Sequence, residues 1–432
     1  MKIQLKFSQL FCLIIILTAP NFCQSRSADN LNAIKLLMID GKYPEAIKNL
    51  NSIIENDSSN VEALYYLGLN YESMSRYVDA SNVLQKAVKY KANDTKLLLS
   101  LGTNYFSAGL INDAETVLSK AFLLDSTNSQ IQIILGRVLM NGKKWDKAAS
   151  IYSKLIESDS ANSYFYEQNA KCEEQLGNIN EAIANYKTAN SLNPRNMNTT
   201  LELSYLLYLQ NQFKEATQVV DSGLNYYPNS ISLWERKGDI NIKIQDYNSA
   251  LASYYRALTI GDSTADNLKN IGICFYWRGQ NTSSTNDYES ALNFLKHSVE
   301  LDSNDATAYF YLGASYKALN KYKLSLENFT KAAALLKNDF LSNTFTQIGA
   351  VYQLDDKYYD ALEYYRYALL ENPSNISILF YIAVIQDKLK NVKYALNFYN
   401  KFLAGSNGAD KKLIAYAKKR VSELKNNKTV KH

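Results

Sequence analysis

The side chains best suited to acid–base, nucleophilic or metal chemistry are few in this sequence. Among 432 residues there are two His and four Cys. His432 is the last residue, and His297 has no His or Cys near it in the sequence, so neither has the neighbours of a catalytic or zinc site. The sequence contains no Gly-rich phosphate loop, no Gly-x-Ser-x-Gly elbow and no His-Glu-x-x-His helix. We therefore expect no enzyme activity, no bound metal and no cofactor.

The carboxylates fit a structural role better than a chemical one. The segments 57–60, 125–128 and 159–162 read DSSN, DSTN and DSAN. Asp, Ser and Asn are common helix N-caps, whereas a calcium loop needs alternating oxygen ligands over about twelve residues. Glu173 and Glu174 lie in a polar helical stretch. These residues predict helix ends and solvated helix faces. Cys172 and Cys274 are too few for a disulfide framework and predict small, partly buried helix residues.

Charge and composition narrow the class of protein further. The net charge is +5, and residues 411–432 alone contain seven Lys, one Arg and a single acid, Glu423. The body of the chain is therefore nearly neutral, which argues against a nucleic-acid-binding surface. Only 5 Pro and 16 Gly occur, and this scarcity favours helices. The 34 Tyr require a structural explanation.

The first 25 residues resemble a secretory signal peptide. Lys2 and Lys6 precede the apolar run LFCLIIILTA at 10–19, which is too short to span a membrane. We expect cleavage after Ser25, with Ser27 as a second option and a buried helix as the alternative interpretation. Lipidation of Cys23 remains open, although bacterial lipoproteins carry a small residue where this chain has Phe22.

Two columns of small residues repeat every 34 positions along the chain. Both columns shift together, by seven residues after 272 and by two after 325, which marks insertions in a single array. The first column contains Gly68, Gly102, Gly136, Ala170, Ser204, Gly238, Gly272, Gly313, Gly349 and Ala383. The second contains Ala46, Ala80, Ala114, Ala148, Ala182, Ala216, Ala250, Ala291, Ser325, Ala361 and Ala395.

The spacing of the other apolar residues predicts a helical hairpin in each repeat. Bulky residues stand three places before and four places after each member of the second column, as Tyr77 and Leu84 do around Ala80. Gly41, Gly109, Gly177 and Gly279 are expected in the turns between the two helices. We expect the small columns to lie where the helices cross most closely, with the tyrosines filling the gaps and their phenols reaching toward the surface.

This pattern resembles the tetratricopeptide repeat. The resemblance implies an all-α solenoid of about eleven repeats over 27–408 that coils into a right-handed superhelix. The polar segment 281–287 is expected to be a loop in the eighth repeat, and residues 409–432 are expected to form a capping helix with a basic tail. The repeats are expected to begin near Ser27, Val61, Thr95, Ser129, Ser163, Met197, Ile231, Ala265, Ala306, Ser342 and Ile376.

By the same resemblance, a partner would bind in a concave groove lined by positions 2, 5, 9, 12 and 13 of each first helix. The lysine and asparagine pattern with which some family members grip a C-terminal carboxylate is missing. An aromatic, mixed-charge groove remains, although some of these aromatics would pack against the neighbouring repeat instead. The residues that we expect to contact a partner are Tyr65, Phe106, Arg137, Tyr164, Lys171, Tyr205, Tyr208, Tyr276, Trp277 and Phe310. Other residues at these positions are Leu69, Leu99, Ile133, Met140, Glu167, Glu235, Asp239, Lys317 and Phe380.

The sequence thus predicts a non-enzymatic scaffold that binds a protein or an extended peptide. The predicted signal peptide indicates export. The resemblance to bacterial tetratricopeptide repeat proteins implies the cell envelope of a bacterium, either periplasmic or bound to the outer membrane, with secretion as an alternative. A glycan-binding solenoid and a regulatory subunit of an envelope enzyme or secretion complex are the other candidates. The basic C-terminus has two interpretations, a solvated cap or a contact with an anionic surface, and the oligomeric state is open.

Overall fold

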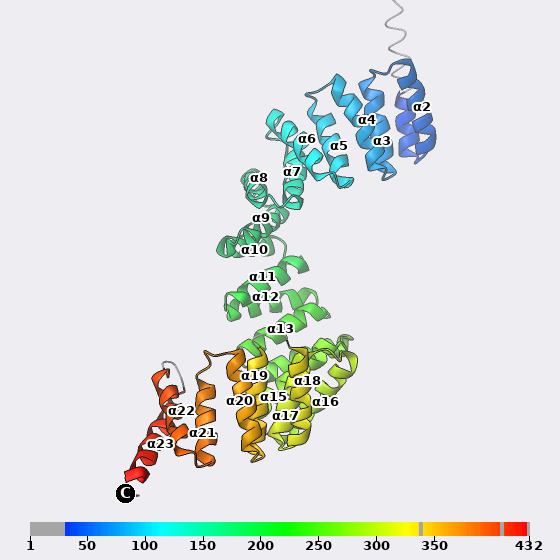
Figure 1. The fold of residues 1–432 in the computed structure, drawn as a ribbon. Coiled ribbons are helices and arrows are strands. Elements are labelled where there is room, and N and C mark those ends of the chain that lie inside the picture. Colours follow the sequence, from blue (N-terminus) through cyan, green and yellow to red (C-terminus); the bar gives the residue numbers. More distant parts are fainter. Residues whose placement is uncertain (1–30, 337–339, 407–409, 430–432) are drawn as a thin grey trace, which may run out of the picture. The chain divides into compact units, whose positions relative to one another are not determined.

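The computed structural model describes residues 31–336, 340–406 and 410–429. The predicted signal peptide and Cys23 lie outside these residues. Every regular element among the described residues is an α-helix (Figure 1), as the sequence predicts. The chain divides into two compact units, Met1–Leu206 and Leu207–His432, and the division falls within the sequence of α11 (Met197–Leu209).

In the first unit, residues 31–39 are helical and are followed by helices that alternate between first and second members of each pair. The second members are α2 (Tyr43–Asn56), α4 (Tyr77–Tyr90), α6 (Ile111–Leu124), α8 (Trp145–Ser158) and α10 (Ile179–Leu192). The first members are α3 (Val61–Ser73), α5 (Thr95–Ser107), α7 (Ser129–Asn141) and α9 (Ser163–Gln175).

The second unit continues the alternation. Its first helices are α13 (Ile231–Lys243), α15 (Ala265–Thr282), α17 (Ala306–Ala318), α19 (Phe340–Leu354) and α21 (Ser377–Lys388). Its second helices are α12 (Phe213–Tyr226), α14 (Tyr247–Ile260), α16 (Thr285–Leu301), α18 (Tyr322–Leu335), α20 (Tyr358–Glu371) and α22 (Val392–Ala404), and α23 (Lys411–Thr429) follows them. From Val61 to Ala306, each predicted repeat start coincides with the first residue of a first helix.

The polar segments between repeats act as helix caps, as predicted. The Asn60 side chain accepts a hydrogen bond from the backbone N–H of Ala63 at 3.0 Å, and Asn128 and Asn162 cap α7 and α9 in the same way. Gly41, Gly109 and Gly177 have positive φ in the turns. Gly279 does not, because it lies inside α15, and Ser283 takes the left-handed conformation instead.

The glycine column makes room for one large side chain of the paired helix. A Cβ atom on Gly68 would lie 2.6 Å from Cγ of Leu84, and one on Gly102 would lie 2.4 Å from Cγ of Leu118. The obstacle is therefore the bulky residue four places after the alanine column, not the alanine itself. The alanines of the second column are fully buried.

The tyrosines of this bulky column do not reach the surface, contrary to expectation. Tyr152, Tyr186, Tyr254, Tyr365 and Tyr399 are all less than 2% exposed. Three of their phenols pass beneath the first helix and donate hydrogen bonds to polar side chains there. The distances are 2.7 Å from Tyr254 to Asp239, 2.9 Å from Tyr365 to Gln353 and 3.5 Å from Tyr186 to Glu174. The phenols point inward because the small residue opposite leaves space there.

The expected loop at 281–287 is for the most part helical. α15 extends to Thr282, and α16 begins at Thr285 instead of Tyr288. Asp287 is buried and holds the extended pair together, since Arg278 donates two hydrogen bonds to its carboxylate at 2.6 and 2.9 Å. Tertiary contacts thus outweigh the low helix propensity of this Ser-, Thr- and Asn-rich segment.

The last helix, α23, packs against α22. Its apolar residues Ala417, Val421 and Leu424 are buried in a cluster with Phe380 and Phe402. Arg420 joins α23 to the end of α21, because its Nη2 lies 3.0 Å from an oxygen of Asp387. α23 therefore covers the side of the final repeat.

Candidate binding surface on the first helices

Within each unit, first helices of neighbouring repeats lie next to one another. α5 contacts α7 in the first unit, and α15 and α19 both contact α17 in the second. We call positions 2, 5, 9, 12 and 13 of these helices the first-helix face. These positions hold all the residues predicted to contact a partner, and the described structure places each of them as follows.

In the first unit, the aromatic residues of this face lie under cations from the next repeat. Nζ of Lys96 lies 4.5 Å from the centre of the Tyr65 ring, and the guanidinium of Arg137 lies 5.3 Å from the centre of the Phe106 ring. Arg137 itself is exposed, whereas Tyr65 and Phe106 are half-buried. Cation–π pairs of this kind contribute about 0.5–1 kcal/mol at exposed sites, so these aromatics link neighbouring repeats.

Tyr164 and Lys171 lie on α9. Tyr164 is 36% exposed and contacts the buried rings of Tyr152 and Phe165 edge-on. Lys171 forms an ion pair of 2.7 Å with Glu167, which also accepts a hydrogen bond from Asn196 at 2.8 Å. The charge of Lys171 is therefore neutralised within its own repeat.

Tyr205 and Tyr208 lie on α11, on either side of the division between the units. Tyr205 is 38% exposed in the first unit. Tyr208, in the second unit, contacts Phe213 edge-on at 6.0 Å and lies 5.7 Å below Nζ of Lys243.

Tyr276 and Trp277 belong to an aromatic cluster that draws on three successive repeats of the second unit. The Trp277 cluster consists of Tyr247, Tyr276, Trp277 and Tyr311. The ring of Tyr276 lies 5.2 Å from that of Trp277 and 5.3 Å from that of Tyr311, while Tyr247 and Trp277 are stacked at 6.5 Å. The indole N–H of Trp277 donates to the Tyr311 hydroxyl at 3.3 Å.

The two predicted members of the cluster differ in what they offer a partner. Burial next to Tyr288 and Tyr311 raises the pKa of Tyr276 to about 12, so this residue acts mainly as packing between repeats. Trp277 remains 38% exposed on top of it. The cluster is therefore a rigid base that presents one large indole to solvent.

Phe310 was predicted to line the surface, but it is a core residue. It is only 8% exposed and packs against Phe329 and Phe340, with ring centres 5.3 and 4.8 Å away. The cause is α19, which begins at Phe340, two residues before the expected start, and so covers Phe310. Phe380 is likewise 6% exposed, because Tyr416 of α23 packs on it at 5.7 Å.

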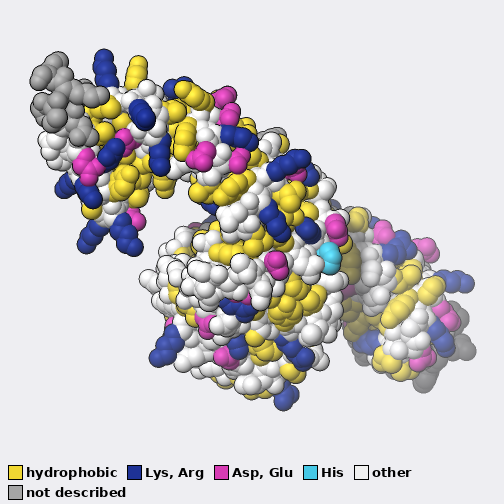
Figure 2. Space-filling view, turned by 90° about the horizontal axis from the view of Figure 1, so that it is seen from below, with side chains coloured by type: hydrophobic (Ala, Val, Ile, Leu, Met, Phe, Trp, Pro, Cys, Tyr) yellow, Lys and Arg dark blue, Asp and Glu magenta, His cyan; other side chains and the backbone are white. Residues whose placement is uncertain are grey.

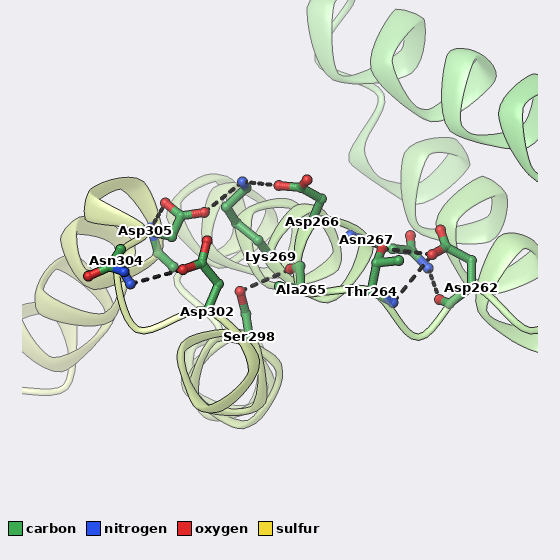
Figure 3. A network of polar contacts seen from close by, with 11 residues as sticks. Asp262, Thr264, Ala265, Asp266, Asn267, Lys269, Ser298, Asp302, Asn304 and Asp305 are labelled. Carbon is green, nitrogen blue, oxygen red and sulfur yellow. Dashed lines mark hydrogen bonds and ion pairs between the residues drawn. The ribbon is translucent and has the colours of Figure 1, made fainter.

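A polar network fixes the start of α15 (Figure 3). Lys269, at position 5, bridges Asp266 at 2.5 Å and Asp305 at 2.7 Å. Burial lowers the pKa of Lys269, but these two carboxylates raise it more, so the amine stays charged. Ser298 of α16 donates to the carbonyl of Ala265 at 2.9 Å. The network joins the start of α15 to α16 and to the start of α17. The charge of Lys269 is therefore neutralised by carboxylates of this chain.

Two charged positions of the second unit lack such complete compensation. Burial raises the pKa of Glu235 and of Asp239 on α13, and Asp262 adds to the effect on Glu235. Lys317 on α17 donates to the amide oxygen of Gln347 at 2.5 Å, and burial lowers its pKa. No carboxylate among the described residues pairs with Lys317. The first-helix face thus has an acidic position on α13 and an unpaired cation on α17, on either side of α15.

Figure 2 shows one side of the molecule, seen from below the view of Figure 1. On this side, Lys and Arg are interspersed with Asp and Glu around areas of apolar side chains. Within the described part of the chain, no group of three or more His, Cys, Asp or Glu is arranged to hold a metal ion. Cys172 and Cys274 are buried free thiols, and burial raises the pKa of each to about 12. None of the described helices has the length and apolar character needed to cross a membrane.

Sequence reasoning missed two members of the cluster. Tyr247 is the first residue of α14 and was expected only to fill space between helices, and Tyr311 stands at position 6 of α17, outside the expected binding positions. Tyr311 lies in the repeat after Trp277 but at a different position of its helix, so the repeat pattern gives no signal that the two residues are in contact.

Comparisons with known proteins agree with the repeat pattern. Residues 175–237 and 231–260 match two family models, both described as tetratricopeptide repeat. A TPR repeat-containing protein of Methanocaldococcus jannaschii is 25% identical over 194 residues, which are 44% of this chain and 34% of that protein. Tetratricopeptide repeat protein 8 of Caenorhabditis elegans is 17% identical over 238 residues, which are 55% of this chain and 45% of that protein. The matches therefore span less than half the length of either relative.

Solved structures with a similar arrangement include two helical proteins. The Cut9–Hcn1 hetero-tetramer of APC/C has 13% identity and a TM-score of 0.47, with coverage of 90% of this chain and 95% of that chain. Yeast Tom70 has 14% identity and a TM-score of 0.42, with coverage of 94% and 97%. The family models and the sequence relatives therefore show tetratricopeptide repeats in part of the chain, at residues 175–260.

Proposed function

We propose that this chain is a non-enzymatic scaffold of the cell envelope that holds an extended peptide or a protein segment on its first-helix face. The observation that carries the proposal is the Trp277 cluster. A 38% exposed indole is fixed by a hydrogen bond and by three tyrosines, so it offers a large contact area with little side-chain entropy left to lose.

The charges beside the cluster favour a partner with both kinds of charge. Glu235 and Asp239 on α13 favour a cationic side chain, and the unpaired Lys317 on α17 favours a carboxylate. An aromatic or aliphatic residue of the partner would contact Trp277 between them. Charges placed in this way determine the direction in which a peptide binds more than its affinity.

Location in the envelope rests on the sequence of residues 1–25, which lie outside the described structure. Export predicts that the protein purified from its native source begins at Arg26 or shortly after it. Intact-mass measurement of that protein tests this, and a chain that retains Met1 would contradict it. Lipidation of Cys23 would instead give a chain that begins at Cys23 and carries the added mass of the lipid.

The binding proposal is tested by capture and crosslinking from the native envelope fraction. The informative variant is Trp277→Ala, and the matched control is Tyr359→Ala on the second helix α20, where the ring is 77% exposed. We expect Trp277→Ala to lose the crosslinked partner and Tyr359→Ala to keep it, with both variants keeping the helical circular dichroism of the wild type. Capture that is equal in the three proteins would contradict the assigned surface.

Glycan binding is the second candidate, because the stacked Tyr247 and Trp277 rings could hold a sugar face. A glycan array probed with the same three proteins distinguishes the two. Binding to glycans that depends on Trp277, with no captured protein, would replace the peptide proposal.

A further inference from the structure

The solvent side of α23 carries one sign of charge. Among the α23 side chains whose burial is described, the exposed charged residues are five lysines, which we call the lysine face: Lys411, Lys412, Lys418, Lys419 and Lys425. At 100° per residue they fall on one side of the helix, opposite the buried Ala417, Val421 and Leu424. Three pairs are seven residues apart, so they lie one above another along the helix. The face is thus a compact basic strip on a helix whose other side is fixed to the repeat array.

The carboxylates near the lysine face already accept hydrogen bonds from other groups. Asp387 and Glu423 both accept hydrogen bonds from Arg420, with Nη2 of Arg420 3.0 Å from Asp387 and Nη1 2.7 Å from Glu423. Asp410 accepts a hydrogen bond from the backbone N–H of Lys412 at 2.8 Å, as a helix cap does. Among the described residues, Lys419 is the one member of the lysine face with a carboxylate within 4 Å, that of Glu423 at 3.9 Å. The positive charge of the strip is therefore largely uncompensated.

Capping alone does not require this arrangement. A cap needs a polar outer side, which mixed charges would provide without mutual repulsion. Lys411 and Lys412 also occupy the first turn of α23, where no acid is present and where the helix dipole disfavours positive charge by about 0.3–1 kcal/mol. The lysines are thus placed at some cost to the helix itself.

The basic character extends to the adjoining helices. Residues 376–432 contain twelve Lys and Arg and three Asp and Glu, for a net charge of +9, whereas residues 27–375 have a net charge of −7. Lys388, Lys390, Lys393 and Lys401 in α21, α22 and the turn between them are also exposed. Attraction to a polyanionic surface is therefore confined to the C-terminal end of the chain.

We propose that the lysine face of α23 binds the surface of an anionic lipid bilayer. A row of lysines along one side of a straight helix suits a plane of headgroups, and ammonium groups bind such phosphates as point charges. Tyr416, 49% exposed and one turn from Lys412, lies at the border of the strip, where an aromatic ring with a polar tip suits the membrane interface. Nucleic acid fits less well, because the only arginine of α23 is engaged by Asp387 and Glu423.

Co-sedimentation of the purified full chain with vesicles tests the proposal. The probes are phosphatidylcholine vesicles with and without about 30% phosphatidylglycerol, at low and at physiological salt. We compare the wild type with a variant in which the five lysines of the strip are changed to Gln. The matched control changes Lys86, Lys89, Lys91, Lys143 and Lys147 to Gln, five exposed lysines of the first unit, and so removes the same charge.

The wild type and the control are expected to bind the anionic vesicles and to release them as salt rises. The lysine-face variant is expected to bind more than about 100-fold more weakly, since each lysine near an anionic surface contributes about a fivefold factor. The apolar segment at 10–19 is the same in all three proteins, so its contribution cancels.

Three results would overturn the proposal. The first is that the wild type binds anionic and neutral vesicles equally well. The second is that the control loses as much binding to anionic vesicles as the lysine-face variant does. The third is that the wild type binds a DNA duplex more tightly than it binds the vesicles at the same salt. Equal thermal unfolding of the three proteins shows that α23 remains folded in the variant. Both sets of substitutions leave Trp277 and its neighbours unchanged, so partner capture on the first-helix face is measured independently.

Discussion

The glycine at position 8 of a first helix leaves space for one large residue of the second helix. Gly238 faces the ring of Tyr254, whose hydroxyl passes under α13 to Asp239. One small residue therefore permits both the close packing of the helix pair and the anchoring of a polar side chain on the first-helix face. The same buried tyrosine therefore fills the core of the helix pair and fixes the position of Asp239 on the first-helix face.

Changing Gly102 to Ala should destabilise the first unit by about 1–3 kcal/mol, because the new Cβ would lie 2.4 Å from Leu118 in a filled core. Urea unfolding followed by circular dichroism measures the loss. The control is Gly142→Ala, where the nearest atom, a backbone oxygen, is 3.4 Å away and φ is −76°. A stability of Gly102→Ala equal to that of Gly142→Ala would contradict the packing described.

Changing Glu235 to Gln should alter how stability depends on pH. Burial, together with Asp262 and Asp239, raises the pKa of Glu235 above its unfolded value, so the folded state binds the proton more tightly. Glu235 therefore costs no stability below the unfolded pKa, and its cost appears as pH rises through the folded pKa. We expect Glu235→Gln to match the wild type near pH 3.5 and to exceed it at pH 7 in urea unfolding. The exposed Glu55→Gln should show no such pH-dependent gain, and a gain that is the same at both pH values would refute the assignment.

At the scale of helices, the repeat spacing alone predicts where most elements begin. Bulky residues such as Tyr77 and Trp145 stand at the first position of most second helices, three places before a buried small residue, and this relation can be read without coordinates. The extended hairpin of α15 and α16 could not be predicted in this way. Its polar residues have loop-like propensities, and the ion pair between Arg278 and Asp287 that keeps them helical is a tertiary contact.

The candidate surface was predicted less completely than the fold for a related reason. Position numbers identified Trp277 but also selected Phe310, because they assume that every repeat starts in the same way. α19 starts early and covers Phe310 with Phe340. Tyr311 was missed because position 6 of a first helix is not among the positions expected to contact a partner, although its hydroxyl accepts a hydrogen bond from Trp277. Contacts between repeats depend on such irregularities, which an average pattern omits.

Changing Asp287 to Ala should loosen the extended hairpin, because it leaves Arg278 without its two charged hydrogen bonds. We expect a loss of about 1–3 kcal/mol in unfolding free energy and faster hydrogen exchange at residues 278–288. Glu289→Ala removes an exposed carboxylate from the same helix and serves as the control. Equal exchange in the two variants would mean that the ion pair does not hold the hairpin.

At the scale of the whole chain, contacts run between neighbouring helices, so a disturbance should remain local. Each unit has several hydrophobic clusters rather than one, and the last of them combines α21, α22 and α23. α23 shows how such a chain ends: it buries apolar residues on one side and leaves charged ones on the other.

Changing Leu424 to Ala should open this last cluster, since the side chain is only 4% exposed. We expect a loss of about 2 kcal/mol and faster hydrogen exchange in α22 and α23, with no change in α13 to α16. Ser422→Ala, at an exposed position of α23, is the control. Faster exchange throughout the second unit would show that the repeats unfold together rather than one after another.

The hairpin of α15 and α16 also has a practical consequence. The array gained seven residues there without losing its spacing on either side, because they lengthen two helices at their shared end and leave the packed faces in phase. The two residues outside the helices, Ser283 and Ser284, are therefore a natural place to graft a fluorescent reporter or an affinity tag. A label there would follow the chain in living cells without altering any residue of the packed helix faces.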